Sequence, residues 1–194
     1  FCGMRKIGLY GGSFDPVPSG HLLVASAARE ELGLDRMFFI PAQQSPFKPD
    51  ARPAPATERI RLLRLALAGQ SWCEIDLQEI ERGGVSYTID TLRSYATRFP
   101  DTQLFYLIGG DHVRTLPNWR AAEELARLAE FVIIPRPGEE RVEFPAGFRG
   151  QYLVGIPFAV SSSQIRTRIR SRLPIDNLVP ETVAEAIHNN RLYL

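Results

Sequence analysis

The chain has 194 residues, 44% of them hydrophobic, and a formal net charge of +1 at pH 7. This length and composition allow a buried core and favour one domain, and so small a net charge excludes a general electrostatic attraction to nucleic acid. No apolar run reaches the roughly 18 residues that a membrane span needs, and no secretory leader is recognisable. The two cysteines show neither metal-ligand spacing nor a disulfide framework. We therefore expect a cytoplasmic protein.

The first predicted elements are a strand and a helix joined by a glycine turn. Residues 6–10 form a short apolar run that ends at Gly11 and Gly12, which is typical of a buried strand followed by a tight turn. Residues 22–32 have the apolar spacing of a helix, and Gly33 is a stop signal for it. The segment therefore predicts a strand, a turn and a helix in close succession.

The start of this helix is suited to bind an anion. We expect Ser19 to cap it, while Pro18 fixes its own φ and favours an extended conformation before it. Unpaired N–H groups and the positive end of the helix dipole then favour an anion just beyond Ser13 and Gly20, and His21 adds an imidazole donor. The alternative is an ordinary strand-to-helix turn with a surface histidine, because the glycine spacing matches neither a Walker loop nor the usual dinucleotide fingerprint.

Strands and helices alternate along the rest of the chain. Thr57 is expected to cap the second helix and Gly69 to stop it. We expect one domain over residues 4–194, with a helical portion from about residue 161. Residues 1–3 are left out of it, because they precede the first methionine and resemble a cloning remnant. Strand–helix alternation predicts an α/β fold with an open, mainly parallel sheet, right-handed crossovers and helices on both faces. Strands are expected at 36–40, 103–108 and 130–134, with one or two short strands in 72–80 and a last one at 152–155; helices are expected at 57–68, 87–99, 119–128, 162–171 and 180–189.

Three loops follow predicted strands and so fall at one edge of such a sheet. Ligands of open α/β sheets bind outside the carboxyl ends of the strands, near the point where strand order reverses. The loops concerned are 11–21, 41–50 and 109–119, and each carries groups suited to a nucleotide. The sequence therefore predicts one nucleotide site built from all three.

Two motifs resemble the signatures of the nucleotidyltransferases that carry a His-x-Gly-His sequence. The first is Gly11-Gly12-Ser13-Phe14-Asp15-Pro16 followed by Gly20-His21, and the second, Val160-Ser161-Ser162-Ser163-Gln164-Ile165-Arg166, is similar to the Ser-Ser-Thr-x-x-Arg signature near their C-terminus. Within that superfamily the chain resembles the bacterial nicotinate-mononucleotide adenylyltransferases. The supporting stretches, in family order, are Tyr87-Thr-Ile-Asp-Thr-Leu92, Leu107-Ile-Gly-Gly-Asp111, Leu116-Pro-Asn-Trp119, Arg136-Pro-Gly138 and Leu178-Val-Pro-Glu181.

The resemblance implies a Rossmann-like nucleotidyltransferase fold and an enzyme of NAD biosynthesis. The family transfers AMP from ATP to nicotinate mononucleotide, giving deamido-NAD and pyrophosphate, with Mg²⁺ accompanying ATP. Its partners are then these two small molecules, with no nucleic acid and no membrane, and homo-oligomer formation stays open. No metal ligand among the side chains is expected.

The resemblance also implies roles for particular residues. His21 and Arg166 are the expected catalytic groups, and an aromatic ring at Trp119 stacks on the pyridine ring. The ATP-binding residues implied are Gly11, Gly12, Ser13, Phe14, Gly20, His21, Gly109, Asp111, Ser162, Ser163 and Arg166; the substrate-binding residues are Lys48, Tyr87, Thr88, Asp111 and Trp119.

Each of these residues also has a purely structural interpretation. Ser162 could cap a helix with Arg166 on its solvated face, Asp111 could cap the element that follows it, and Trp119 could belong to the core. Lys48 could be an ordinary loop cation. These interpretations compete with the functional ones position by position, and only the spatial arrangement separates them.

Pro18 departs from the family motif. The family has a histidine three residues before His21, which contacts the α-phosphate, whereas proline offers no donor. Loss of one such donor typically lowers the rate roughly 10²- to 10³-fold. Three interpretations follow: a variant of low activity, a donor such as His112 reaching in from elsewhere, or a homologue that binds nucleotide with weak catalysis. Transfer to another phosphate acceptor, such as phosphopantetheine, is a further alternative.

Overall fold

The computed structural model describes residues 4–134, 136–155 and 159–194; the expected cloning remnant at 1–3 lies outside them. Their centre is a six-stranded parallel sheet in the order β3-β2-β1-β4-β5-β6. The order reverses between β1 and β4, so the carboxyl ends of these neighbouring strands lie at the switch point. The predicted open parallel sheet is confirmed. The strands are β1 (Arg5–Gly12), β2 (Arg36–Pro41), β3 (Cys73–Ile75), β4 (Thr102–Gly109), β5 (Glu130–Ile134) and β6 (Gly150–Tyr152).

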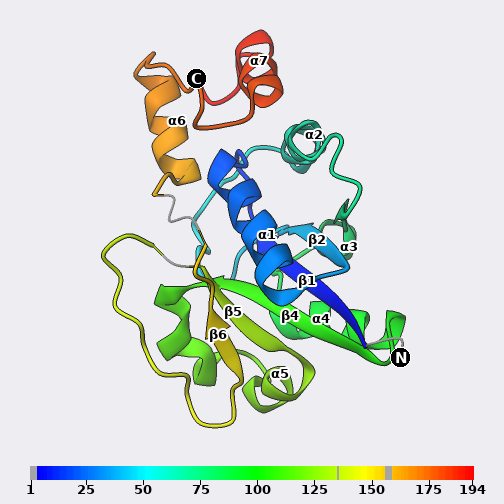
Figure 1. Cartoon of the computed structure of the whole chain (residues 1–194). Coiled ribbons are helices and arrows are strands. Elements are labelled where there is room, and N and C mark those ends of the chain that lie inside the picture. The colour runs from blue at the N-terminus through cyan, green and yellow to red at the C-terminus, as the bar shows by residue number, and fades with distance from the viewer. Residues whose placement is uncertain (1–3, 135, 156–158) are drawn as a thin grey trace.

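Helices cover both faces of the sheet. One core joins α1, α2, α6 and α7 to one face, and a second core joins α4, α5 and the 3₁₀ helix η1 to the other. Figure 1 shows α1 in front of the sheet and α2, α6 and α7 grouped at one end of it. The helices are α1 (Ser19–Leu32), α2 (Ala56–Ala66), α3 (Gln78–Arg82), α4 (Thr88–Arg98), η1 (Gly110–Asn118), α5 (Ala122–Leu128), α6 (Ser162–Arg170) and α7 (Glu181–Asn189).

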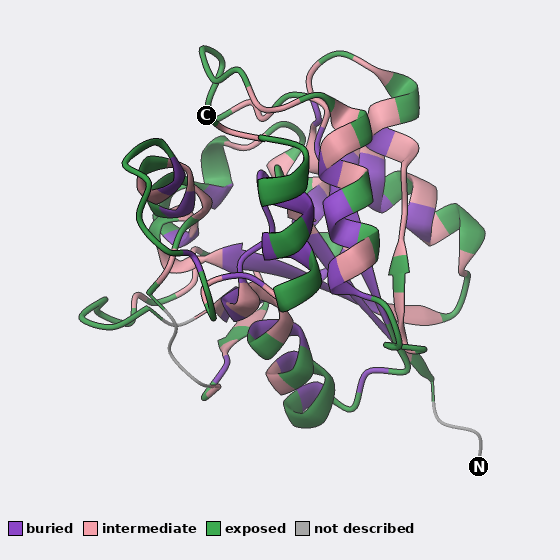
Figure 2. Cartoon of the chain, turned by 90° about the horizontal axis from the view of Figure 1, so that it is seen from above, coloured by how far each residue is buried: buried purple, intermediate pink, exposed green. Residues whose placement is uncertain are grey.

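Alternating side chains of the strands supply the two cores. In β2, Met37 and Phe39 enter the core beneath α1, whereas Phe38 and Ile40 enter the core beneath α4. Successive side chains of a strand point to opposite faces, so a strand covered on both sides must be apolar throughout. Figure 2 shows these buried strands between the helices. Among the described residues, no helix is both long and apolar enough to cross a membrane.

The first helix begins and ends as the proline and glycine dictate. Pro18 is the N-cap, with φ −78° and ψ 156°, and Gly33 closes the helix in the left-handed region at φ 65°. The expectation that Ser19 caps the helix is wrong, because Ser19 is its first residue and donates its backbone N–H to the carbonyl of Leu178 at 2.9 Å. Tertiary pairing with the segment before α7 thus satisfies a donor that a side-chain cap would otherwise serve.

Several other boundaries differ from the prediction. The segment 72–80 contains only the strand β3 and then the helix α3, whose start is fixed by Asp76 accepting from the backbone N–H of Gln78 at 3.0 Å. The N-cap of α2 is Pro55 rather than Thr57, and the helix ends at Ala66, before Gly69. The predicted helix 119–128 begins only at Ala122, after η1, and the strand expected at 152–155 is the shorter β6. Short elements carry too few residues for periodicity to place their ends.

Candidate functional site

The β1–α1 loop (residues 13–18) follows two glycines that aromatic side chains approach closely. A Cβ on Gly11 would lie 2.5 Å from the hydroxyl oxygen of Tyr106, and one on Gly12 would lie 3.2 Å from the ring of Phe14. Phe14 is buried at φ 47°, with its ring centroid 5.7 Å from that of His21. The glycines therefore allow close packing of aromatic rings against the backbone, which is a structural reason for their presence in addition to any role toward phosphate.

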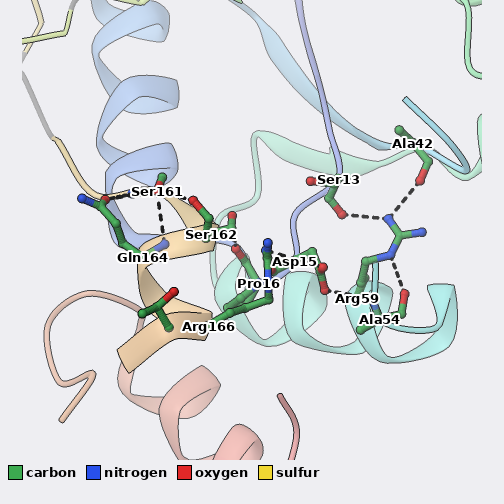
Figure 3. Close-up of polar contacts among 12 residues, drawn as sticks. Ser13, Asp15, Pro16, Ala42, Ala54, Arg59, Ser161, Ser162, Gln164 and Arg166 are labelled. Carbon is green, nitrogen blue, oxygen red and sulfur yellow. Dashed lines mark hydrogen bonds and ion pairs between the residues drawn. The ribbon is translucent and has the colours of Figure 1, made fainter. Parts of the chain in front are cut away.

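A buried arginine of α2 holds this loop from one side (Figure 3). The Nη1 atom of Arg59 donates to the carbonyl oxygens of Ser13 at 2.7 Å and Ala42 at 2.9 Å, and Nε donates to that of Ala54 at 3.0 Å. The buried Asp15 carboxylate accepts from the backbone N–H of Ala54 at 3.2 Å. Burial lowers the pKa of Arg59, and the nearby Asp15 carboxylate opposes that shift. The hydrogen bonds from the buried guanidinium to three backbone carbonyls thus fix the loop.

Helix α6 holds the same loop from the other side. Ser162 Oγ donates to the carbonyl of Pro16 at 2.7 Å, and Arg166 Nη1 donates to the carbonyl of Asp15 at 2.7 Å while lying 3.6 Å from its Oδ2. Figure 3 shows both side chains reaching from the helix to the loop. The structure thus brings the two predicted phosphate motifs together, although they lie about 150 residues apart in the sequence.

The cap of α6 is Ser161, one residue before the position that the structural interpretation assigned. Its side chain accepts from the backbone N–H of Gln164 at 3.3 Å, and the Gln164 side chain accepts from the backbone N–H of Ser161 at 2.8 Å, forming a capping box. Ser163 is exposed beside it. Ser162 therefore does not cap the helix, and Arg166 does not lie on a solvated face.

His21 lies in the first turn of α1 against the rings of Tyr10 and Phe14. Its Nδ1 atom is buried and has no hydrogen-bond partner within the described part of the chain. Burial, with a smaller contribution from the positive charge of Arg136, lowers the pKa of His21 to about 4. The imidazole is therefore neutral at pH 7, with one ring nitrogen available to donate a proton and one to accept.

Three of the five predicted substrate residues, Tyr87, Thr88 and Trp119, meet in an aromatic cavity of about 110 Å³, whereas Lys48 and Asp111 do not line it. Tyr87 and Thr88 form one wall and Trp119 another, while Phe47, which the sequence reasoning missed, supplies a ring 5.0 Å from that of Trp119. The guanidinium of Arg120 lies 4.7 Å from the Tyr87 ring centre. We call this the aromatic cavity; its full lining is Pro46, Phe47, Tyr87, Thr88, Ile89, Asn118, Trp119, Arg120 and Leu125. Lys48 is exposed next to Phe47 and does not line it.

Asp111 lies at the carboxyl end of β4, exposed, with an oxygen 3.8 Å from Nη1 of Arg136. A Cβ on Gly109 would lie 2.5 Å from that same oxygen, so the glycine allows the carboxylate to fold back over the strand end. The N-cap of η1 is Gly109 and no side chain caps it, so Asp111 does not cap the element that follows. Asp111 borders a second hollow, of about 380 Å³.

Arg59 and Phe47 escaped the sequence reasoning, and Asp15 appeared there only as part of the first motif, with no role of its own. Arg59 had a usable signal, because it occupies the first position of the apolar stripe of α2, followed by Leu62, Leu63 and Ala66 at the spacing of a buried helix face. Asp15 and Phe47 carried none that periodicity can detect. Among the described residues there is no group of three or more His, Cys, Asp or Glu side chains that could hold a metal ion.

Comparison with known proteins finds a matching family model and similar sequences. Residues 9–168 match the model of the family described as cytidylyltransferase-like. The nicotinate-nucleotide adenylyltransferase of Bacillus subtilis is 38% identical over 192 residues, covering 98% of this chain and 99% of that protein. A Bacillus licheniformis protein with the name "Probable nicotinate-nucleotide adenylyltransferase" is 40% identical over 192 residues, again covering 98% and 99%.

Two solved structures share the fold across almost the whole chain. Both are Plasmodium falciparum nicotinic acid mononucleotide adenylyltransferase, complexed in one case with NaAD and in the other with APC. Their TM-scores are 0.76 and 0.77 at 20% and 19% sequence identity, and each comparison covers 97% of both chains. At that identity the likeness speaks for the fold.

Proposed function

Because the chain belongs to the cytidylyltransferase-like family and, within it, to the nicotinate-nucleotide adenylyltransferases, we propose that it transfers AMP from ATP to nicotinate mononucleotide, forming deamido-NAD and pyrophosphate. One observation carries the proposal: two phosphate motifs distant in sequence meet at the end of β1, at the edge of the sheet that also bears the aromatic cavity. A nucleoside triphosphate matches the two phosphate motifs, and a mononucleotide with an aromatic ring matches the aromatic cavity.

The proposed reaction requires the protein to align the two substrates and to stabilise charge rather than to form a covalent bond with them. The attacking 5′-phosphate is already an anion, so the rate depends on bringing it in line with the α-phosphate and on stabilising charge there and on the leaving pyrophosphate. His21 would donate from its neutral ring to an ATP phosphate, next to the backbone of residues 12–14 and 20. Mg²⁺ would arrive with ATP and offset charge on the phosphate oxygens.

The second phosphate motif would bind the β/γ end of ATP. The Arg166 guanidinium has five N–H donors, and the bond to the Asp15 carbonyl through Nη1 orients it at the loop. Ser162 and Ser163 lie in the first turn of α6, where the helix dipole favours an anion. Gly109 and Asp111 would contact the nucleotide from the end of β4.

The aromatic cavity would receive the pyridine ring. Trp119 would stack on it, Tyr87 and Thr88 would line its edge, and the exposed Lys48 would face the substrate phosphate. The packing of the Phe47 ring on the Trp119 ring supports this assignment, because aromatic rings pack favourably on one another. This part of the site favours a pyridine mononucleotide over an acceptor without a ring.

Pro18 favours a second candidate, a nucleotide-binding homologue with weak catalysis. It is buried as the N-cap of α1 and offers no N–H or side-chain donor where the family has a histidine. His112, the proposed substitute, packs on Phe47, a residue of the aromatic cavity, at a ring distance of 4.8 Å.

The test compares the parent with Pro18→His, using ATP, Mg²⁺ and either nicotinate or nicotinamide mononucleotide, with pyrophosphate release as the readout. We expect product with the nicotinate form and a gain of roughly 10²-fold or more on Pro18→His. The matched control is Pro180→His, since Pro180 is likewise the N-cap of a helix, but of α7. Absence of product above background at high enzyme concentration would reject the adenylyltransferase. A parent with ordinary turnover and no gain on Pro18→His would reject the weak homologue.

A further inference from the structure

Glu79 is a buried carboxylate that the proposed chemistry does not use. It belongs to the short helix α3, and only 4% of its surface is exposed. Thr91 Oγ1 donates to its Oε1 at 2.6 Å, and the hydroxyl of Ser86 lies nearby. The guanidinium of Arg82 adds a positive charge nearby and donates to Thr91 Oγ1 at 3.4 Å. Burying a carboxylate costs free energy, which hydrogen bonds and nearby positive charge must offset.

Ser86 and Thr91 flank one wall of the aromatic cavity. Ser86 comes just before Tyr87, Thr88 and Ile89, which line the cavity, and Thr91 comes two residues after them. The Glu79 carboxylate thus holds this short segment through Thr91. Because hydrogen bonds to an ionised acceptor are short and directional, they fix the place of the wall better than apolar packing alone.

Ser86 also connects the Tyr87–Ile89 wall to the segment that contains Pro46 and Phe47. Its Oγ accepts from the backbone N–H of Gln43 at 3.0 Å, and its own backbone N–H donates to the carbonyl of Gln44 at 2.9 Å. Gln44 further pairs with Val85 in an isolated parallel bridge. The chain leaving Gln44 reaches Pro46 two residues later and Phe47 three residues later, and both line the same cavity.

We propose that Glu79 is a positioning residue that sets the separation between the Tyr87–Ile89 wall and the Pro46–Phe47 wall, and thereby the affinity for the pyridine mononucleotide. The inference rests on the proposed function, because it takes the aromatic cavity as the acceptor site. Glu79 itself touches no substrate; it acts through Thr91 on the segment whose other end, Ser86, is bound to Gln43 and Gln44. The loop that contacts ATP phosphates is held by Arg59 and α6, which are separate from this network.

The test is a split between two Michaelis constants. We expect Glu79→Ala to raise the KM for nicotinate mononucleotide about tenfold while the KM for ATP changes less than about twofold, because only acceptor binding loses its ordered wall. Glu79→Gln keeps one carbonyl acceptor and is expected to recover most of the loss. Glu81→Ala, on an exposed residue of the same helix, is the matched control and is expected to behave as the parent. Thr91→Val, which removes one donor, gives a smaller shift in the same direction and serves if Glu79→Ala does not fold.

The outcomes separate the two proposals. Equal rises in both constants, or no rise in either, would overturn the positioning role while leaving the adenylyltransferase standing. A Glu79→Gln variant as impaired as Glu79→Ala would also overturn it, because the hydrogen-bond acceptor would then not matter. A parent without product overturns the proposed function and the positioning role together.

Discussion

Arg59→Met is expected to destabilise the protein and to weaken ATP binding, with little effect on the aromatic cavity. The guanidinium holds the β1–α1 loop through the carbonyl of Ser13 and ties it to the carbonyls of Ala42 and Ala54. Methionine fills much of the space of the arginine stem but donates no hydrogen bond. The substitution therefore removes the donors while keeping most of the packing.

The size of the effect follows from which carbonyls water can reach. Ser13 is exposed, so water can replace the lost donor there, whereas Ala42 is buried and Ala54 is half-buried. At about 1–3 kcal/mol for each buried acceptor left unpaired, the free energy of unfolding should fall by about 2–4 kcal/mol. For a chain of this length that corresponds to a Tm lower by roughly 5–15 °C.

Urea unfolding measures the stability, and initial rates at varied ATP measure the KM. Arg64→Met is the matched control, because Arg64 is an exposed residue of the same helix and its substitution should change stability by no more than about 0.5 kcal/mol. We expect Arg59→Met alone to raise the KM for ATP. If it unfolds like the control, or raises the KM for nicotinate mononucleotide as much as that for ATP, the loop is not held as described.

Two further predictions concern residues on either side of this loop, His21 in α1 and Gly11 in β1. The pKa of His21 is about 4 in the folded protein against 6.5 ordinarily, so the unfolded chain binds more protons between these two pH values. The free energy of unfolding must therefore fall as the pH drops from 6.5 to 4, by up to about 3 kcal/mol. If urea titrations give the parent the same pH dependence as His21→Gln, the prediction is contradicted. Gly11→Ala should cost about 1–3 kcal/mol, because the new Cβ would lie 2.5 Å from the Tyr106 hydroxyl oxygen. Combination with Tyr106→Phe should recover much of that loss, and simply additive thermal melts would argue against the clash.

Long periodic segments were predictable from the sequence, whereas short ones were not. The strand 103–108 and the helix 22–32 were placed correctly because their apolar pattern extends over several turns or a full buried strand. The segment 72–80 was read as strand, yet α3 begins where Asp76 binds the backbone of Gln78. Such a local hydrogen bond leaves no periodic signal. The same holds for Ser19, whose N–H is satisfied by Leu178 from a distant segment.

The residues of the candidate site likewise divide into those that the sequence indicated and those that it did not. Motif spacing brought Ser162, Arg166 and the glycine turn to notice, and the structure brings them together through the carbonyls of residues 15 and 16. Their roles toward ATP stay predictions. Phe47 and Glu79 were not foreseen, because each owes its place to residues on other segments: Phe47 to the ring of Trp119, and Glu79 to Thr91.

The sequence alone determined the parallel α/β architecture, the glycine turn after the first strand and the family, because these depend on periodicity and on motifs that are local in the chain. It also showed that Pro18 offers no donor, which no fold can alter. Only the tertiary structure decided that Arg59 and α6 hold one loop from two sides, that burial lowers the pKa of His21, and that the buried carboxylate of Glu79 holds one wall of the aromatic cavity through Thr91. Burial and contacts between distant segments set these properties, and neither is written in the spacing of residues along the chain.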